Sequence, residues 1–514
     1  MPSWTKEQEL AISKSGCNII VSAGAGSGKT AVLTERVIRK LQNGGDISRL
    51  LILTFTNAAA KEMKERIRNA LKKANLKEEL AKIDASYITT FDSFALSIVK
   101  KYHYLLNINQ DIEIANDLIL KWKKEELLKS IFDELYEREN PLFLKLIKDF
   151  SIRDDTNMQD SILEINDKLD LMYEKREYLT TYFNTYYSDS YIAKRIFEYV
   201  QIIFKKIQKI KDNLENLEML DEDFSASMYE VLGNLLNSKT YLEIKNSIDI
   251  KLPRLKKGMD DLKPYKEKIS NLLKDILKLT IYENEEEIKT AIIKTKDYVE
   301  IIIYIILKLD TKFSKFKQKN DLYDFTDISK LAIKIVLENA SVASELKNSF
   351  DEILVDEYQD TSDLQELFIS LIAKNNVYMV GDIKQSIYRF RNANPNLFKE
   401  KYEAYQNNQG GFKIDLVKNF RSREETLANI NYIFNYIMDL EIGGADYKNY
   451  HQMIFGNTTY DEFKQKTQDY NFNIYNYTLE DNIYSKDEVE AFITASDILS
   501  KINSNYQRSG RAHV

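Results

Sequence analysis

Residues 19–30 read Ile19-Ile20-Val21-Ser22-Ala23-Gly24-Ala25-Gly26-Ser27-Gly28-Lys29-Thr30. The segment opens with apolar β-branched residues, continues with small residues and ends on a Lys-Thr pair, an order that predicts a strand, a tight loop and the start of a helix. Small residues let backbone N–H groups close around phosphate oxygens, and the helix N-terminus adds partial positive charge. We therefore predict a nucleotide-binding loop formed by Ala23, Gly24, Ala25, Gly26, Ser27, Gly28, Lys29 and Thr30.

Two side chains of this loop have predicted chemical roles. Lys29 would reach the β- and γ-phosphates of ATP, and the Thr30 hydroxyl would bind Mg²⁺. Ala23 stands where the usual motif has its first glycine, and it keeps the loop compact. A glycine-rich turn without function is the alternative interpretation, which the lysine, the hydroxyl and the strand–helix context together disfavour.

A second predicted strand ends in two acids, Asp356 and Glu357. Ligands of open α/β sheets bind at the carboxyl ends of the strands. Asp356 can therefore hold Mg²⁺, and Glu357 can orient or deprotonate the attacking water. A strand followed by a helix cap is the alternative. The two motifs lie more than 300 residues apart, a spacing that disfavours small kinases and GTPases and favours a motor ATPase with an inserted domain.

The chain alternates between two kinds of sequence. Short apolar runs at 17–22, 50–54, 352–356, 377–381 and 413–417 precede helical patterns, as expected for a parallel α/β sheet. Between about 116 and 320 glycine and proline nearly vanish, which predicts a helical insertion. We expect a motor domain at 1–115 and 319–408, a helical insertion at 116–318 and a second motor domain beginning at 409–514.

Composition excludes several classes of protein. The chain has 514 residues, 44% of them hydrophobic, and a net charge of -7, which argues against coating nucleic acid by bulk electrostatics. One cysteine and three histidines offer no disulfide framework or zinc cluster. The N-terminus lacks a secretory signal, and the longest apolar run, 301–307, is too short to span a membrane. We expect a cytoplasmic location.

Several of these motifs together resemble the UvrD/Rep/PcrA group of superfamily 1 helicases, whose motor domains are RecA-like P-loop folds. Asp356-Glu357-Tyr358-Gln359-Asp360-Thr361 is similar to the DExQD signature, and Thr5-Lys6-Glu7-Gln8 is similar to the Q motif. The resemblance implies that Gln8 hydrogen-bonds adenine. In the segment 380–391 it implies that Gln385 senses the γ-phosphate. In 418–422 it implies that Phe420 packs on adenine and Arg421 reaches the γ-phosphate.

The same resemblance implies contacts with single-stranded DNA. Tyr388 and Phe390 would stack on bases, each stack contributing roughly 1–3 kcal/mol. Residues 54–63 are similar to the group's first DNA motif, through Phe55 and Asn57, and residues 88–94 to the next, through Thr90. The group commonly has histidine where this chain has Asp92, and an ionised carboxylate cannot donate to a phosphate. Burial of these aromatic residues in the core is the alternative.

The opening 4–8, the segment 323–328 and the run 384–398 resemble the AddA subunits of helicase–nucleases. This resemblance implies an ATP-driven 3′–5′ helicase that acts in double-strand-break repair with an AddB-type partner subunit. Motifs V and VI and the nuclease domain are not recognisable, and residues 508–514 look like a truncated end. We therefore expect weak ATP binding and little unwinding. A nucleotide-binding switch and a binding module without turnover are the competing hypotheses.

Overall fold

The computed structural model describes residues 4–151, 153–255, 258–457, 472–478 and 484–504. The chain divides into two compact units. Unit 1 contains residues 1–114 and 321–514, and unit 2 contains residues 115–320. Each unit has its own hydrophobic core.

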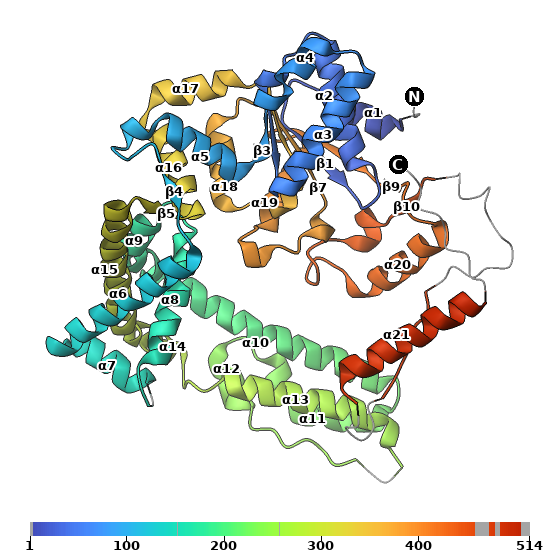
Figure 1. Cartoon of the computed structure of the whole chain (residues 1–514). Helices are drawn as coiled ribbons and strands as arrows, with labels where there is room; N and C mark the ends of the chain where they lie inside the picture. The colour runs from blue at the N-terminus through green and yellow to red at the C-terminus, as the bar shows by residue number, and fades with distance from the viewer. Residues whose placement is uncertain (1–3, 152, 256–257, 458–471, 479–483, 505–514) are drawn as a thin grey trace. The chain divides into compact units, whose positions relative to one another are not determined.

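A six-stranded sheet forms the centre of unit 1 (Figure 1). All of its strand pairs are parallel, and the strand order is β3-β2-β6-β7-β1-β8. The strands are β1 (Ile19–Ala23), β2 (Leu50–Thr54), β3 (Tyr87–Thr90), β6 (Glu352–Val355), β7 (Val377–Gly381) and β8 (Phe412–Leu416). The predicted α/β fold class with a parallel sheet is confirmed, and the sheet continues past residue 408 because β8 pairs with β1.

The sheet is covered on both faces, which explains why the residues of β1, β2, β6 and β7 are all buried. One face packs against apolar residues of the first group of helices, among them Leu33 and Ile67. These helices are α1 (Lys6–Ser13), α2 (Lys29–Gln42), α3 (Asn57–Lys73) and α4 (Lys77–Lys82). The remaining helices of the sheet domain are α5 (Phe91–Lys101), α16 (Phe325–Glu338), α17 (Ala340–Ser349), α18 (Asp363–Ile372) and α19 (Pro395–Gln406).

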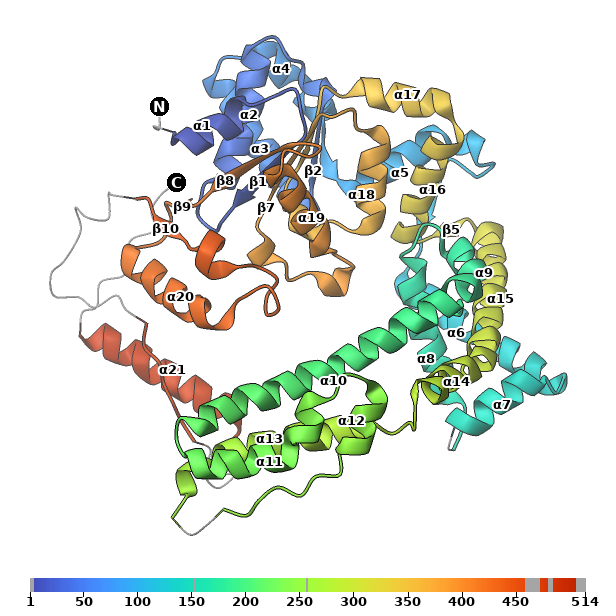
Figure 2. The ribbon, with the colours of Figure 1, turned by 180° about the vertical axis from the view of Figure 1, so that it is seen from behind.

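Unit 2 leaves and rejoins the sheet domain at a pair of short parallel strands. They are β4 (Glu113–Ile114) and β5 (Leu322–Tyr323), both in unit 1. Parallel pairing of segments that flank about 200 residues holds the two ends of the insertion side by side. Figure 1 labels both strands, and Figure 2 shows β5 from behind. This pair therefore joins one sheet domain that is discontinuous in sequence.

Unit 2 is helical and has two cores. One core is formed by α6 (Asp117–Glu137), α7 (Pro141–Phe150), α8 (Thr156–Asp170), α9 (Lys175–Tyr186) and α15 (Lys296–Asn320). The other is formed by α10 (Asp189–Glu218), α11 (Glu222–Asn237), α12 (Tyr241–Ser247), α13 (Lys263–Leu279) and α14 (Glu285–Lys294). In α10 the buried residues recur every three or four positions from Ile192 to Leu217, the period of one helix face.

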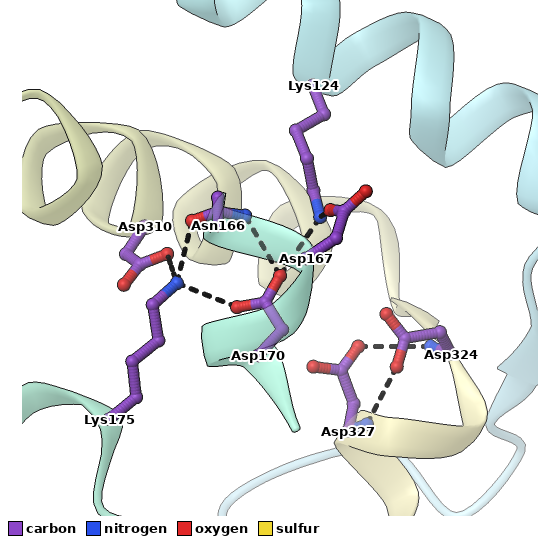
Figure 3. Close-up of polar contacts among 8 residues, drawn as sticks. All are labelled: Lys124, Asn166, Asp167, Asp170, Lys175, Asp310, Asp324 and Asp327. Atoms are coloured by element: carbon purple, nitrogen blue, oxygen red, sulfur yellow. Dashed lines mark hydrogen bonds and ion pairs between the residues drawn. The ribbon is translucent and has the colours of Figure 1, made fainter. Parts of the chain in front are cut away.

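A network around two lysines connects four helices of unit 2 (Figure 3). The Nζ atom of Lys175 donates to Asn166 at 2.7 Å, Asp170 at 2.7 Å and Asp310 at 2.6 Å. Lys124, on α6, binds the second oxygen of Asp170 at 3.0 Å. Because a buried charge is costly unless it is paired, this network fixes how α6, α8, α9 and α15 pack.

The part of unit 1 after β8 contains a small βαβ arrangement. It consists of β9 (Lys418–Asn419), α20 (Glu424–Ile437) and β10 (Ile454–Phe455), with β9 parallel to β10. The helix α21 (Lys486–Asn503) follows, and its N-cap is Ser485. Residues 508–514, which we interpreted as a truncated end, lie outside the described residues. Among the described helices, none combines the length and apolar character needed to cross a bilayer.

Candidate functional site

The predicted phosphate loop connects β1 directly to α2. Gly26 and Gly28 have φ values of 72° and 86°, in the left-handed region that favours glycine. Gly28 is the N-cap of α2, and no side chain caps this helix end. The first N–H groups of α2 therefore point out of the helix without a side-chain cap, as an anion site at a helix N-terminus requires.

Lys29 and Glu357 meet although they lie 328 positions apart in sequence. The Lys29 Nζ atom donates to Glu357 Oε2 at 2.8 Å and to Oε1 at 3.1 Å. Glu357 follows β6 and has φ 52° and ψ 47°, an unusual left-handed conformation for a residue with a side chain. The two predicted catalytic side chains are thus brought together, and each neutralises the other.

Two further carboxyl groups lie beside this pair. Burial, and then the charge of Glu357, raise the pKa of Asp356 to about 6. The same two causes raise the pKa of Asp360 to about 6. Each of these two carboxyl groups therefore binds a proton more readily than an ordinary aspartate does.

The residues at this edge of the sheet fit a magnesium ion. Carboxylate and hydroxyl oxygens are the ligands that Mg²⁺ prefers, and Asp356 with the Thr30 hydroxyl would supply them. Within the described residues no group of three or more His, Cys, Asp or Glu side chains could enclose a metal.

The predicted adenine residues hold the phosphate loop in this structure. Gln8 is 6% exposed, its Nε2 atom donates to the Ser27 carbonyl at 3.0 Å, and its Oε1 atom accepts from the Thr5 N–H at 3.0 Å. The Phe420 N–H donates to the Gly26 carbonyl at 2.8 Å. The Phe420 ring also lies beside Gly456. Both residues therefore adjoin the loop, and their contact with a base stays a prediction.

Asn419 links the small βαβ arrangement to the loop. Its Nδ2 atom donates to the Ala25 carbonyl at 2.7 Å, and its Oδ1 atom accepts the N–H groups of Arg421 and Ser422, both at 2.8 Å. A Cβ atom on Gly26 would lie 2.8 Å from that of Arg421. The backbone of Arg421 is thus placed against the loop, and Gly26 leaves the room for it.

Gln385 is bound to a protein carboxylate. Its Nε2 atom donates to Asp382 Oδ2 at 2.8 Å, while Lys384 Nζ pairs with Asp382 Oδ1 at 2.8 Å. Asp382 is only 1% exposed. Gly24 of the phosphate loop lies close, because a Cβ atom there would be 4.0 Å from Asp382 Oδ2. The predicted γ-phosphate sensor therefore lies near the loop but is held by Asp382.

Three predicted DNA-binding aromatic residues form one cluster. The ring centroids of Phe55 and Tyr388 are 4.6 Å apart, and those of Tyr388 and Phe390 are 5.8 Å apart. The guanidinium of Arg391 lies 5.8–5.9 Å from all three rings. Phe390 is 75% exposed, so this ring is not part of the core. Phe55 and Tyr388 are half-buried. One exposed and two half-buried rings beside a cation suit the bases and phosphates of a single strand.

A cavity of about 210 Å³ joins the aromatic cluster to the acids. Its lining includes Phe55, Thr90, Asp92, Asp356 and Arg391. The Thr90 hydroxyl caps α5 by accepting the Ser93 N–H at 3.2 Å.

Asp92, which has no predicted role, lines this cavity, whereas the predicted DNA-contact residue Asn57 does not. Burial raises the pKa of Asp92, the residue that departs from the helicase pattern. Asn57 is exposed at the start of α3, and it does not line the cavity. The described contacts therefore do not bring Asn57 to the aromatic cluster.

Sequence reasoning assigned no role to three residues that organise this site, Gln359, Arg391 and Asn419. Each stands inside a motif that was recognised, but a motif match does not give the partner of a side chain. The sequence indicated Asn419 and Arg391 only through their position next to Phe420 and Phe390, residues with predicted roles.

The chain is similar to known proteins over most of its length. Residues 4–406 match the family model of the UvrD/REP helicase N-terminal domain. The chain is similar to proteins named as AddA-type subunits of an ATP-dependent helicase/nuclease. It is 34% identical to that of Clostridium kluyveri over 86% of this chain and 40% of that protein. It is 33% identical to that of Clostridium novyi over 90% and 41%, and 35% identical to that of a Thermoanaerobacter species over 88% and 41%. The chain spans about 40% of the length of these relatives.

Proposed function

The chain belongs to the UvrD/REP helicase N-terminal domain family, and on this premise we propose that it binds ATP with Mg²⁺ and hydrolyses the ATP in response to single-stranded DNA. The observation that carries the proposal is the contact of Lys29 with Glu357 at 2.8 Å, at the mouth of the phosphate loop. A structural ion pair alone would not require a left-handed glutamate or an uncapped helix end beside it.

The residues of the site act by exchanging partners. Incoming phosphates attract Lys29 and so release Glu357, whose carboxylate then accepts a proton from, or orients, the attacking water. Asp356 and the Thr30 hydroxyl would hold Mg²⁺, which would supply positive charge against the phosphates. Gln385 leaves Asp382 and binds the γ-phosphate. Gln8 and Phe420 bind the adenine, and Arg421 approaches the γ-phosphate from the βαβ arrangement.

The aromatic cluster carries the DNA side of the proposal. Phe55, Tyr388 and Phe390 stack on bases, with Thr90 and Asn57 toward the backbone. Gln385 and Tyr388 lie three residues apart in one segment that begins at the end of β7. Movement of this segment on nucleotide exchange therefore moves the DNA platform.

For the whole protein we propose the activity that the names of the relatives carry, that of an ATP-dependent helicase/nuclease. In this proposal it is a cytoplasmic 3′–5′ DNA translocase that unwinds duplex ends in double-strand-break repair, together with an AddB-type partner subunit. The unwinding direction would be tested with duplexes that carry a single-stranded tail at one end only.

The first experiment measures ATP hydrolysis by the chain with and without single-stranded DNA. The variant is Lys29→Ala, and the matched control is Lys77→Ala, which removes an exposed lysine at the start of α4. We expect hydrolysis that DNA stimulates, that survives in the control and that is lost in Lys29→Ala. ATP binding without hydrolysis would refute turnover and favour a nucleotide-binding protein.

A further inference from the structure

Gln359 bridges the ends of two neighbouring strands. It lies in the 3-10 turn η5 (Tyr358–Asp360) after β6 and is 1% exposed. Its Nε2 atom donates to Glu357 Oε2 at 2.9 Å and to Asp360 Oδ2 at 3.1 Å. Its Oε1 atom accepts the N–H of Asp382, after β7, at 2.9 Å. One buried amide thus contacts two acids on one strand end and the backbone of the other.

The sequence leaves room for this amide through Gly381. A Cβ atom at position 381 would collide with Gln359 Oε1 and would lie 3.2 Å from the Gln359 nitrogen. Gly381 has an ordinary strand conformation in β7, so close approach rather than backbone geometry requires the glycine. The Ser386 hydroxyl donates to the Gln359 carbonyl at 3.3 Å, which adds a second connection to the same segment.

We propose that Gln359 is a positioning residue that holds the Glu357 carboxylate in its reactive orientation after the phosphates have taken Lys29. Among the contacts that the structure describes for this carboxylate, the side-chain donors are Lys29 and Gln359. Glu357 is 37% exposed, so a glutamate without either donor would rotate toward water. The inference rests on the proposed function, because reactive orientation has meaning only if the chain hydrolyses ATP.

The kinetic test compares Gln359→Met with wild type and with Gln409→Met, an exposed control. Methionine keeps the length of the side chain but donates no hydrogen bond. We expect kcat to fall by about 10²-fold, the effect of a small misplacement of a catalytic group, while KM for ATP changes less than about threefold. An unchanged kcat, or a loss confined to KM, would overturn the inference.

A charge variant adds a readout that a purely structural role would not change. Gln359→Glu removes both donors but regains one when it is protonated, so its kcat relative to wild type should be higher at pH 6 than at pH 8. Gln409→Glu is the control, because it makes the same charge change at an exposed position. A pH-independent ratio for Gln359→Glu would contradict a role through the donated hydrogen bonds.

A double-mutant cycle separates this inference from failure of the proposed function. If wild type does not hydrolyse ATP, the unfolding constants of Gln359→Met, Glu357→Met and the double variant still report the contact, because methionine at 357 has no oxygen to accept the hydrogen bond. We expect Gln359→Met to raise the unfolding constant at least threefold more in the wild-type background than beside Glu357→Met. Additive effects in the cycle would refute the contact, whatever the chain does to ATP.

Discussion

Replacement of Asp356 by asparagine should stabilise the nucleotide-free protein at neutral pH and abolish its Mg²⁺-dependent chemistry. The folded protein raises the pKa of this group from 3.8 to about 6, first through burial and then through the charge of Glu357. The folded state therefore holds the proton more tightly than the unfolded chain. The contribution of Asp356 to the free energy of unfolding is therefore greatest below about pH 4. It falls as pH rises toward 6 and then stays level.

The magnitude follows from the size of this pKa shift. Two pKa units at 1.36 kcal/mol each make the ionised group destabilising by about 3 kcal/mol above pH 7. The same linkage leaves about 2 kcal/mol at pH 5 and less than about 1 kcal/mol at pH 4. Asparagine is neutral at each pH and its Oδ1 atom can still accept the Glu357 N–H, which lies 3.1 Å from Asp356 Oδ1. The gain of Asp356→Asn should therefore shrink as pH falls.

The assay is urea unfolding followed by tryptophan fluorescence. The chain has two tryptophans, and Trp4 packs on the core of unit 1 while Trp122 is 63% exposed in unit 2. In a Trp122→Phe background, Trp4 reports on unit 1 alone. Asp111→Asn, a change of the same charge at an exposed position, is the control. A gain that is absent at pH 7.5, or equal at pH 7.5 and pH 4, would refute the reasoning.

Three further outcomes are expected. Arg36→Met should destabilise unit 1 by about 3–5 kcal/mol in the same assay. Arg36 contacts the buried Glu352 at 2.5 Å, and the variant leaves Lys40 as the remaining described cation beside that carboxylate. A loss below about 1 kcal/mol would contradict this. The double variant Tyr388→Ala, Phe390→Ala should weaken single-stranded DNA binding by roughly 2–6 kcal/mol, measured by fluorescence anisotropy. Its circular dichroism spectrum should stay unchanged. Unfolding of the variant would instead place the two rings in the core. Gly26→Ala should weaken ATP binding in calorimetry, because its Cβ atom would lie 2.8 Å from Arg421 Cβ and its φ of 72° disfavours alanine; unchanged affinity would show that the loop adapts.

The sequence was sufficient to predict the sheet because parallel strands covered on both faces are continuously apolar. The five predicted strands at 17–22, 50–54, 352–356, 377–381 and 413–417 all appear, within two residues at each end. The strand β3 (Tyr87–Thr90) was not predicted. It lies at the edge of the sheet, its burial alternates, and two threonines precede a helix, so its pattern also suits a loop and a cap.

The site was predictable in composition but not in contacts. The motifs name Lys29, Glu357 and Gln385 because the chemistry of phosphate binding restricts the residue types. No pattern indicates that Lys29 would pair with Glu357, that Gln385 would bind Asp382, or that one amide at Gln359 would join two strand ends. Such contacts depend on strand order, and β7 lies between β1 and β6 in the sheet although it follows β6 in the chain.

The side chains predicted to bind ATP are paired with protein groups in this structure, a property that the motifs alone would not suggest. Lys29 binds Glu357, Gln385 binds Asp382, and Gln8 binds the Ser27 carbonyl. ATP must therefore replace these contacts rather than fill empty ones, so its net affinity is the difference between two sets of hydrogen bonds. Because the protein partners Glu357, Asp382 and Ser27 belong to different segments, we expect the same exchange to move the phosphate loop, Glu357 and the segment leading to Tyr388. A site whose side chains were unpaired would bind ATP more tightly, but we expect it to transmit less of that binding to the rings of Tyr388 and Phe390.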